Sequence, residues 1–189
     1  TEPTFTQVGL KEKKCANCEE KETEEIPVLV DPNAGKPVDK VTIGSTKYAS
    51  LNEALNAAKD GDIIYLPAGS FSEAVKITKQ VSIKGNNVGV NPNTDTRKSE
   101  SLFTGVITVA TSNVTIDGIA LTKTGQINSD TAAAIKNVTL QNIYSYGIDS
   151  DCTWTDASRD YNQNFVMNFV TNTYGNIANI KFINNKFNV

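Results

Sequence analysis

Residues 48–87 read YASLNEALNAAKDGDIIYLPAGSFSEAVKITKQVSIKGNN, and this stretch decides the fold. Ser50 followed by Glu53 is a capping box, which predicts that a helix begins directly after the serine. The next apolar residues recur at i, i+3, i+4 and i+7, as one buried stripe of a helix requires: Leu51, Ala54, Leu55 and Ala58. Gly61 suits a left-handed position after a helix end, so we expect a short helix over residues 51–60.

After this helix the pattern changes to that of short strands. Residues 63–66 are a continuous apolar run, and Pro67-Ala68-Gly69 is a turn signal. Apolar residues then alternate with polar ones at positions 75, 77, 81 and 83. A helix followed by several short strands predicts a fold built mainly from β-structure.

This stretch resembles the opening of the right-handed parallel β-helix proteins of the pectin-lyase-like superfamily, above all the N-terminal part of pectin methylesterases and of many bacterial surface proteins. In those proteins a short helix closes one end of the coil. The resemblance is close over roughly 40 residues and looser up to the C-terminus, and it implies a fold more strongly than an activity. The matching residues are Leu51, Ala54, Leu55, Ala58, Gly61, Asp62, Ile64, Gly69, Phe71, Ile77, Val81, Ile83 and Gly85.

A loose internal repeat points to the same architecture. One template, apolar-polar-apolar-any-Gly/Asn, begins at Val81, Val114, Val138 and Ile180, with spacings of 33, 24 and 42 residues. A coil that returns each strand to the same position, with loops of varying length, produces this combination. We therefore expect an all-β fold: a single-stranded right-handed parallel β-helix of about five to seven coils with a short N-terminal capping helix.

The glycine or asparagine that ends each repeat is expected at a sharp bend, because these two residues tolerate left-handed backbone conformations. If Asn142 and Asn184 stack, their amides can form a ladder along the axis.

Asn113 and Asn137 match glycosylation sequons, but they begin the same repeat element and fit the repeat pattern better. The C-terminal aromatic residues are expected in the core: Phe165, Phe169, Phe182 and Phe187.

The first 30 residues have a different, charged composition. Weak alternation over residues 8–14 and 20–26 predicts a β-hairpin, and the Cys-x-x-Cys lies between its strands. This segment resembles short repeats of Firmicutes cell-surface proteins. Residues 31–40 contain prolines and alternating charges, typical of a linker. We expect a hairpin unit (1–30), a linker (31–40) and the β-helix (41–189), which ends in an open strand edge and is therefore expected to continue past Val189 or to be covered by another chain.

The chain has 3 cysteines and no histidine. Cys15 and Cys18 are interpreted as a reduced or locally bridged turn pair, with half of a zinc site and a redox motif as alternatives. No cofactor is predicted.

The net charge is −3, and neither positive nor negative residues are concentrated in one region, which argues against nucleic acid as a partner. No apolar run is long enough for membrane insertion.

Two insertions interrupt the repeat, and such loops often build binding surfaces. The first is the polar loop of residues 89–101. The second lies within residues 149–161, with residues 172–176 as a further place for part of it. The second loop holds the candidate ligand-binding residues: Asp149, Asp151, Trp154, Asp156, Arg159 and Tyr161. A solvated loop is the simplest interpretation; sugar stacking on Trp154 and Tyr161, a calcium site or an acid/base pair are alternatives.

No catalytic residue is predicted. The Gly-x-x-Asp-Phe-Ile-Phe-Gly signature of pectin methylesterases is absent, and only Arg97 and Arg159 are available as arginines. The expected function is a non-catalytic segment of a secreted or cell-wall-associated bacterial surface protein. It would act as a spacer or as an adhesion and glycan-binding module that contacts a glycan, a host surface or the cell wall. A fragment of a polysaccharide-active esterase or lyase, and a structural β-helix that trimerises, are the alternatives.

Overall fold

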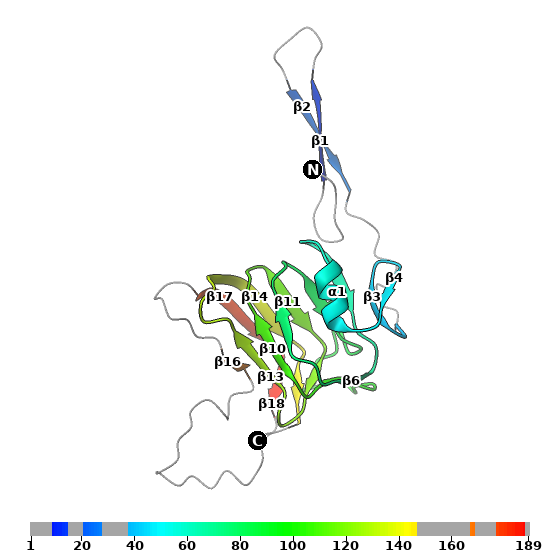
Figure 1. The fold of residues 1–189 in the computed structure, drawn as a ribbon, viewed down its shortest axis with the longest axis vertical. Helices are drawn as coiled ribbons and strands as arrows, with labels where there is room; N and C mark the ends of the chain where they lie inside the picture. Colours follow the sequence, from blue (N-terminus) through cyan, green and yellow to red (C-terminus); the bar gives the residue numbers. More distant parts are fainter. Residues whose placement is uncertain (1–8, 15–20, 28–37, 147–166, 169–176, 188–189) are drawn as a thin grey trace.

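The computed structural model describes residues 9–14, 21–27, 38–146, 167–168 and 177–187. Near the N-terminus, strands β1 (Gly9–Lys14) and β2 (Lys21–Ile26) form an antiparallel two-stranded sheet of their own (Figure 1). Gly9 pairs with Ile26, and Lys14 pairs with Lys21. The predicted hairpin is therefore present, while Cys15 and Cys18 between its strands, and most of the predicted linker, lie outside the described residues.

From residue 63 onward the chain visits three sheets in turn. The first sheet contains β5 (Ile63–Tyr65), β8 (Ser82–Lys84), β11 (Val114–Asp117), β14 (Ile135–Gln141) and β17 (Ile177–Ile183). The second contains β6 (Gly69–Phe71), β9 (Ser101–Phe103), β12 (Ala120–Leu121), β15 (Tyr144–Ser145) and β18 (Lys186–Phe187). The third contains β7 (Val75–Ile77), β10 (Val106–Val109), β13 (Gln126–Ser129) and β16 (Met167–Asn168).

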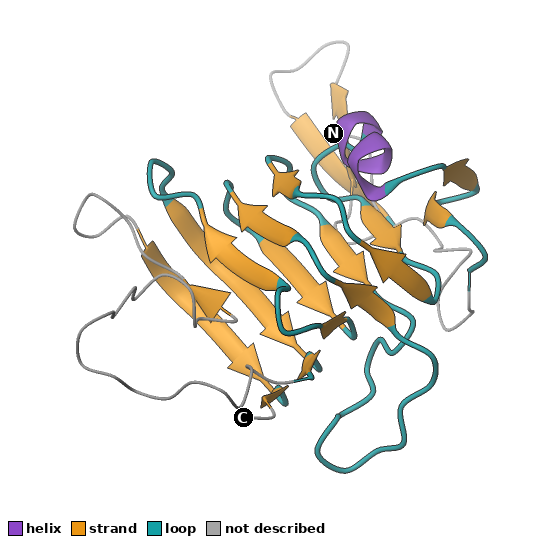
Figure 2. Cartoon of the chain, turned by 60° about the horizontal axis from the view of Figure 1, so that its bottom comes forward, coloured by secondary structure: helices purple, strands orange, loops and turns teal. Residues whose placement is uncertain are grey.

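Every strand in these three sets is parallel to its neighbours from the preceding and following passes. Figure 2 shows the strands stacked side by side, with the helix at one end of the stack. The prediction of a β-rich fold is confirmed in this form: strands dominate, several sheets are parallel, and one helix occurs among the described residues.

The predicted repeat determines the register of the first sheet. Val114 lies opposite Val138, which lies opposite Ile180. Val81 is level with Val114, since Ile83 pairs with Ile116 two residues further along each strand. Residues 81, 114, 138 and 180 therefore lie in register along one sheet, as predicted.

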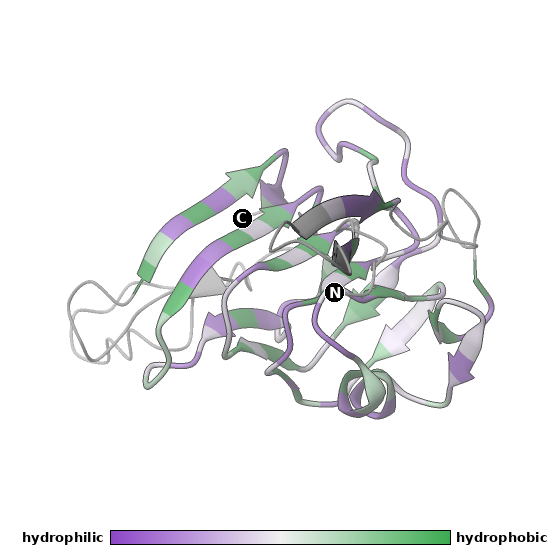
Figure 3. Ribbon diagram, turned by 90° about the horizontal axis from the view of Figure 1, so that it is seen from above, coloured by the Kyte–Doolittle hydropathy of each residue, from purple (hydrophilic) through white to green (hydrophobic). Residues whose placement is uncertain are grey.

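Alternation along the strands places one set of side chains inside the stack. Hydrophobic and hydrophilic residues alternate visibly along the strands (Figure 3). Because neighbouring side chains of a strand point to opposite faces, each inward position forms a row across the sheets. Up to the next-to-last pass these inward rows are fully buried, and they include Ile64, Ile83, Ile116 and Leu140 in the first sheet, Phe103 and Leu121 in the second, and Ile107 and Ile127 in the third.

The capping helix α1 spans Leu51–Ala57 and buries the predicted stripe of Leu51, Ala54, Leu55 and Ala58. The capping box forms, with one variation. Glu53 donates its main-chain N–H to Ser50 Oγ (3.1 Å), and its carboxylate accepts the N–H of Ala49 (2.7 Å), the residue before the cap.

The helix ends before Gly61, so the predicted end at residue 60 is wrong. Ala58 already has extended backbone angles, and its N–H makes the last helical bond, to Ala54 O at 2.8 Å. A turn follows in which Asp62 accepts the N–H of Lys59 at 2.7 Å. Gly61 does adopt a positive φ of 90°, but inside this turn, where its N–H donates to Gln80 O (2.7 Å).

Two short strands before the helix pair antiparallel, unlike the strands of the stack. β3 (Val41–Ile43) pairs antiparallel with both β4 (Thr46–Tyr48) and β5. The turn between β3 and β4 contains Gly44 at φ 56°. This antiparallel hairpin extends the first sheet at its beginning, so seven strands of this sheet lie within the described residues.

The last strands expose aromatic residues that were predicted to be core. Phe182 is 53% exposed and Phe187 is 44% exposed. Both occupy inward rows, since Phe182 pairs with buried Leu140 and Phe187 pairs with buried Ser145. The prediction fails for these two because no further described strand packs over them; Phe165 and Phe169 lie outside the described residues.

Candidate functional site

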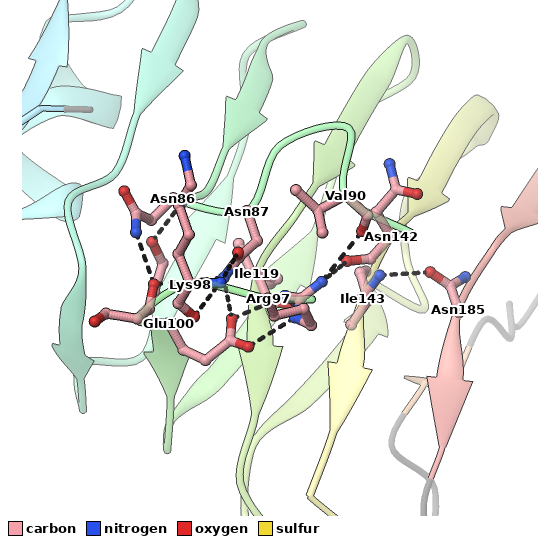
Figure 4. Close-up of polar contacts among 12 residues, drawn as sticks. Asn86, Asn87, Val90, Arg97, Lys98, Glu100, Ile119, Asn142, Ile143 and Asn185 are labelled. Atoms are coloured by element: carbon pink, nitrogen blue, oxygen red, sulfur yellow. Dashed lines mark hydrogen bonds and ion pairs between the residues drawn. The ribbon is translucent and has the colours of Figure 1, made fainter. Parts of the chain in front are cut away.

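The polar loop predicted at residues 89–101 is ordered and crosses several strands of the stack. We call residues 86–100, between β8 and β9, the crossing loop. Its Gly89 N–H donates to the Asp117 carboxylate (3.1 Å), and its Asn93 amide reaches the main-chain oxygen of Asn185 (3.5 Å). Asn87, fully buried at the start of the loop, donates to Glu100 Oε2 (2.8 Å) and accepts the N–H of Lys98 (2.7 Å). The loop is thus tied to successive passes of the chain (Figure 4).

Arg97 is the centre of this network. Its guanidinium makes a bidentate ion pair with Glu100, at 2.7 and 2.8 Å, and both side chains are only 10% exposed. The remaining donors bond main-chain oxygens, with Asn142 O at 3.0 Å and Ile119 O at 3.2 Å. A planar guanidinium can satisfy several acceptors at once, which an ammonium group cannot do in this geometry.

The crossing loop also supports a pair of aromatic rings. Tyr144 and Tyr146 lie two residues apart and therefore share one face of the chain. Their rings meet edge to face, with centroids 4.8 Å apart and an interplanar angle of 79°. The Arg97 guanidinium and the Lys186 ammonium each lie 5.9 Å from the Tyr144 ring centroid. We refer to Tyr144 and Tyr146 as the tyrosine pair.

Tyr146 is the accessible member of this pair, with 51% of its surface exposed. Burial of part of the ring raises the pKa of its phenol, and the Glu100 carboxylate and Tyr144 raise it further, while Arg97 lowers it. The phenol is therefore neutral at physiological pH and can both donate and accept a hydrogen bond. The exposed Tyr146 ring can stack against one face of a sugar, and its hydroxyl can bond a sugar hydroxyl.

A second polar feature runs across neighbouring strands of the first sheet, from the residue before β11 through β14 to β17. Asn113 donates to Gln80 Oε1 (2.8 Å), Asn137 donates to Asn113 Oδ1 (2.9 Å), and Asn179 donates to Asn137 Oδ1 (2.7 Å). We call these four residues the amide ladder. Its three asparagines have φ values of 54–58°, a conformation that asparagine tolerates better than most residues.

The predicted ladder at Asn142 and Asn184 forms differently. Both residues have the expected positive φ, 52° and 53°. However, Asn142 donates its amide to the Asp117 carboxylate at 2.7 Å, and Asp117 also accepts from Gln141 at 2.7 Å. A carboxylate in the preceding pass is a stronger acceptor than another amide, so it captures the Asn142 side chain. Through these contacts the Asp117 carboxylate joins two successive passes of the chain.

The amide ladder borders a hollow of about 390 Å³ on the outer face of the first sheet. We call it the polar hollow. Its lining consists of polar side chains and one glycine: Asp60, Gly61, Gln80, Ser82, Asn113, Thr115 and Asn137. Sequence reasoning did not single it out, because its residues come from different passes and meet only through the strand register.

The candidate ligand-binding residues predicted from the sequence belong to the second polar loop. Asp149, Asp151, Trp154, Asp156, Arg159 and Tyr161 all lie outside the described residues. The described stretch of residues 38–146 ends three residues before the first of them. The tyrosine pair is therefore next to this segment in the sequence.

Two surface carboxyl groups show a lowered pKa. A hydrogen bond from Lys47 is the largest cause of the lowered pKa of Asp39, and one from Lys76 is the largest cause of that of Asp130. Both acids stay ionised at neutral pH, which suits neither to donate a proton. Within the described ranges no group of three or more histidine, cysteine, aspartate or glutamate side chains is arranged to hold a metal ion.

Comparisons of the chain with protein-family models, curated proteins and solved structures found no match. In the part of the chain that the structure describes, no helix is long and apolar enough to cross a membrane.

Proposed function

We propose that the chain is a non-catalytic segment of a secreted or cell-wall-associated bacterial surface protein, acting as a spacer or as an adhesion and glycan-binding module. In this proposal residues 41–189 are a single-stranded right-handed parallel β-helix of the pectin-lyase-like type. Helix α1 closes its first coil, and the N-terminal hairpin is a small separate unit.

The observation that supports this proposal best is the regular return of the chain to three parallel sheets, with each strand in register with the one before. In such a stack each pass is stabilised mainly by its neighbours, so the fold can be long without a globular core. An elongated body with repeated outward polar rows suits a spacer and offers an extended surface to a polymer.

The glycan-binding part of the proposal rests on the tyrosine pair. Tyr146 exposes an aromatic face, Tyr144 fixes it edge to face, and Lys186 lies over the Tyr144 ring. Aromatic rings held this way bury area against a ligand at little cost in side-chain entropy. Trp154 and Tyr161, for which sugar stacking was the alternative to a solvated loop, follow closely in the sequence.

A glycan array probed with the whole chain tests the binding role. We expect binding that falls about tenfold or more in Tyr146→Ala, which corresponds to about 1.4 kcal/mol, and that is largely retained in Tyr146→Phe because the ring remains. Trp154→Ala is expected to weaken the same interaction. Binding that is equal in all variants would contradict the role of the tyrosine pair.

The non-catalytic part is tested by incubating the chain with pectin and other polyuronates. Release of methanol or of unsaturated products would favour the esterase or lyase alternative. If the folded chain shows neither enzymatic activity nor glycan binding, the spacer role is the part of the proposal that remains. Labelling of the chain on intact cells tests the expected extracellular or cell-wall location.

A further inference from the structure

We propose that the polar hollow binds one ring of a neutral, hydroxyl-rich ligand such as a hexose. This site extends the proposed glycan-binding role to the outer face of the first sheet. It involves neither Tyr144 nor Tyr146 and can therefore be present or absent independently of the tyrosine pair.

One end of the hollow is fixed by hydrogen bonds that main-chain N–H groups donate. Gly61 donates its N–H to Gln80 O (2.7 Å), and Gln80 donates its N–H to Asp60 Oδ1 (2.8 Å). Asp62 O accepts the N–H of Ser82 (3.0 Å), which fixes the same turn against β8. A preformed wall lowers the entropy cost of binding, because little of the site must become ordered when a ligand enters.

The floor of the hollow presents hydroxyl groups in register. Ser82 and Thr115 are paired residues of β8 and β11, so their side chains point outward from the same sheet face. Adjacent strands lie about 4.8 Å apart, a distance comparable to the width of one pyranose ring. Neighbouring hydroxyls of a sugar can therefore meet neighbouring strands.

The amide ladder supplies further donors along one side. Each asparagine or glutamine amide nitrogen carries two hydrogens, and the ladder uses one hydrogen from Asn113 and one from Asn137. The ladder bonds also fix the orientation of these amides. A ligand with many hydroxyl groups can bond to such oriented amides without breaking the ladder.

The charge of the lining selects against acidic ligands. Asp60 is the single ionisable residue among the described residues that line the hollow. Its carboxylate accepts hydrogen bonds from hydroxyls and repels another carboxylate. The volume, about 390 Å³, lies in the lower part of the usual range of about 300–1,000 Å³ for ligand pockets, which fits one sugar ring better than an oligomer.

Nuclear magnetic resonance titration of the whole ¹⁵N-labelled chain tests this proposal. The probes are glucose, N-acetylglucosamine and glucuronic acid at millimolar concentration. We expect glucose or N-acetylglucosamine to shift the main-chain amide signals of Ser82 and Thr115, and glucuronic acid to shift them less. Thr115→Val, which removes one hydroxyl and keeps the β-branched shape, is expected to weaken binding about tenfold.

Thr139→Val is the matched control, because Thr139 is the register partner of Thr115 on β14 and does not line the hollow. Its affinity is expected to stay within about twofold of the original. If Thr115→Val does not fold, Ser82→Ala removes the neighbouring hydroxyl instead. Absence of shifts at Ser82 and Thr115, equal weakening by both threonine variants, or stronger binding of glucuronic acid would each overturn the proposal. Shifts confined to Tyr144 and Tyr146 would overturn it and leave the tyrosine pair as the binding site.

Discussion

Arg97 Nη1 lies 3.0 Å from the main-chain oxygen of Asn142, 45 residues further along the chain, and its Nη2 lies 3.2 Å from that of Ile119. One side chain thereby joins two later passes of the chain to the loop that carries it. Glu100 neutralises the guanidinium within the same loop. The crossing loop is therefore part of the packed structure rather than a free surface insertion.

Replacing this arginine should destabilise the fold strongly. Arg97→Ala removes the counter-charge of the Glu100 carboxylate, which keeps only the Asn87 amide on Oε2, and it removes the Arg97 donor from Asn142 O. Removal of one partner of a buried pair costs about 3–5 kcal/mol. We expect a loss of about 3 kcal/mol in the free energy of unfolding, measured by urea denaturation. Arg97→Lys should restore little, because an ammonium cannot reproduce the bidentate geometry.

The neighbouring exposed residue Lys98 provides the control for this experiment. Lys98→Ala is expected to change the free energy of unfolding by less than about 0.5 kcal/mol, as most surface substitutions do. A similar, small effect of Arg97→Ala and Lys98→Ala would contradict a structural role for the loop.

Local pattern was enough to predict the helix, the hairpin and the rows of the first sheet. Ser50, Glu53 and the apolar stripe act within one turn of helix, and Val114 and Val138 repeat a five-residue template. The helix end was misplaced because Gly61 signals a left-handed residue, yet such a residue fits a turn as well as a helix terminus.

The candidate sites were less accessible to sequence reasoning. The role of Arg97 was not predicted. Its partners Ile119 and Asn142 are distant in the sequence, and only the pairing of the strands brings them near it. The same holds for the polar hollow. Phe182 was expected in the core together with the other C-terminal aromatic residues, but burial depends on what packs over it, which the pattern within one strand does not encode.

Gly89 and Gly118 have the same φ of 72°, so alanine substitutions at the two positions distinguish backbone strain from steric conflict. A Cβ at Gly89 would meet nothing within 4 Å, whereas one at Gly118 would lie 2.2 Å from the main chain of Asn87 and Val88. Gly89→Ala should cost about 1–2 kcal/mol for the left-handed conformation alone. Gly118→Ala should cost about 2–5 kcal/mol, since overpacking is added. Equal thermal denaturation midpoints for the two variants would show that the close approach at Gly118 is absent.

The amide ladder contributes through both conformation and hydrogen bonding, and two substitutions at Asn137 distinguish these effects. Asn137→Gly keeps the left-handed conformation and removes two ladder bonds, so we expect a loss of about 0.5–1.5 kcal/mol. Asn137→Ala should lose about 1–2 kcal/mol more, because alanine disfavours a φ of 58°. Chemical denaturation measures both. If the two variants are equally stable, the bend does not require a left-handed residue.

The raised pKa of Tyr146 predicts how stability depends on alkaline pH. The phenol binds its proton more tightly in the folded chain, so its contribution to stability is fully present below the unfolded pKa of about 10 and is lost as pH rises through the higher folded pKa. Tyr146→Phe has no proton to lose. The stability of the original chain relative to this variant, measured by urea denaturation, should be constant up to about pH 9 and fall above about pH 10. A difference that rises over this range would contradict the direction of the shift.

Leu140 and Phe182 are register partners in the same inward row, yet Leu140 is fully buried and Phe182 is 53% exposed. The two positions therefore test whether the rows form one continuous core. Leu140→Ala should cost about 2–5 kcal/mol, because it removes buried methyl groups and leaves a cavity between neighbouring passes. Phe182→Ala should cost less than about 1 kcal/mol, since much of the ring already contacts solvent. The free energy of unfolding of the isolated chain, obtained from urea denaturation, measures both. A loss at Phe182 as large as that at Leu140 would mean that another part of the chain or a second copy covers the final strand in solution, and sedimentation would then distinguish the two.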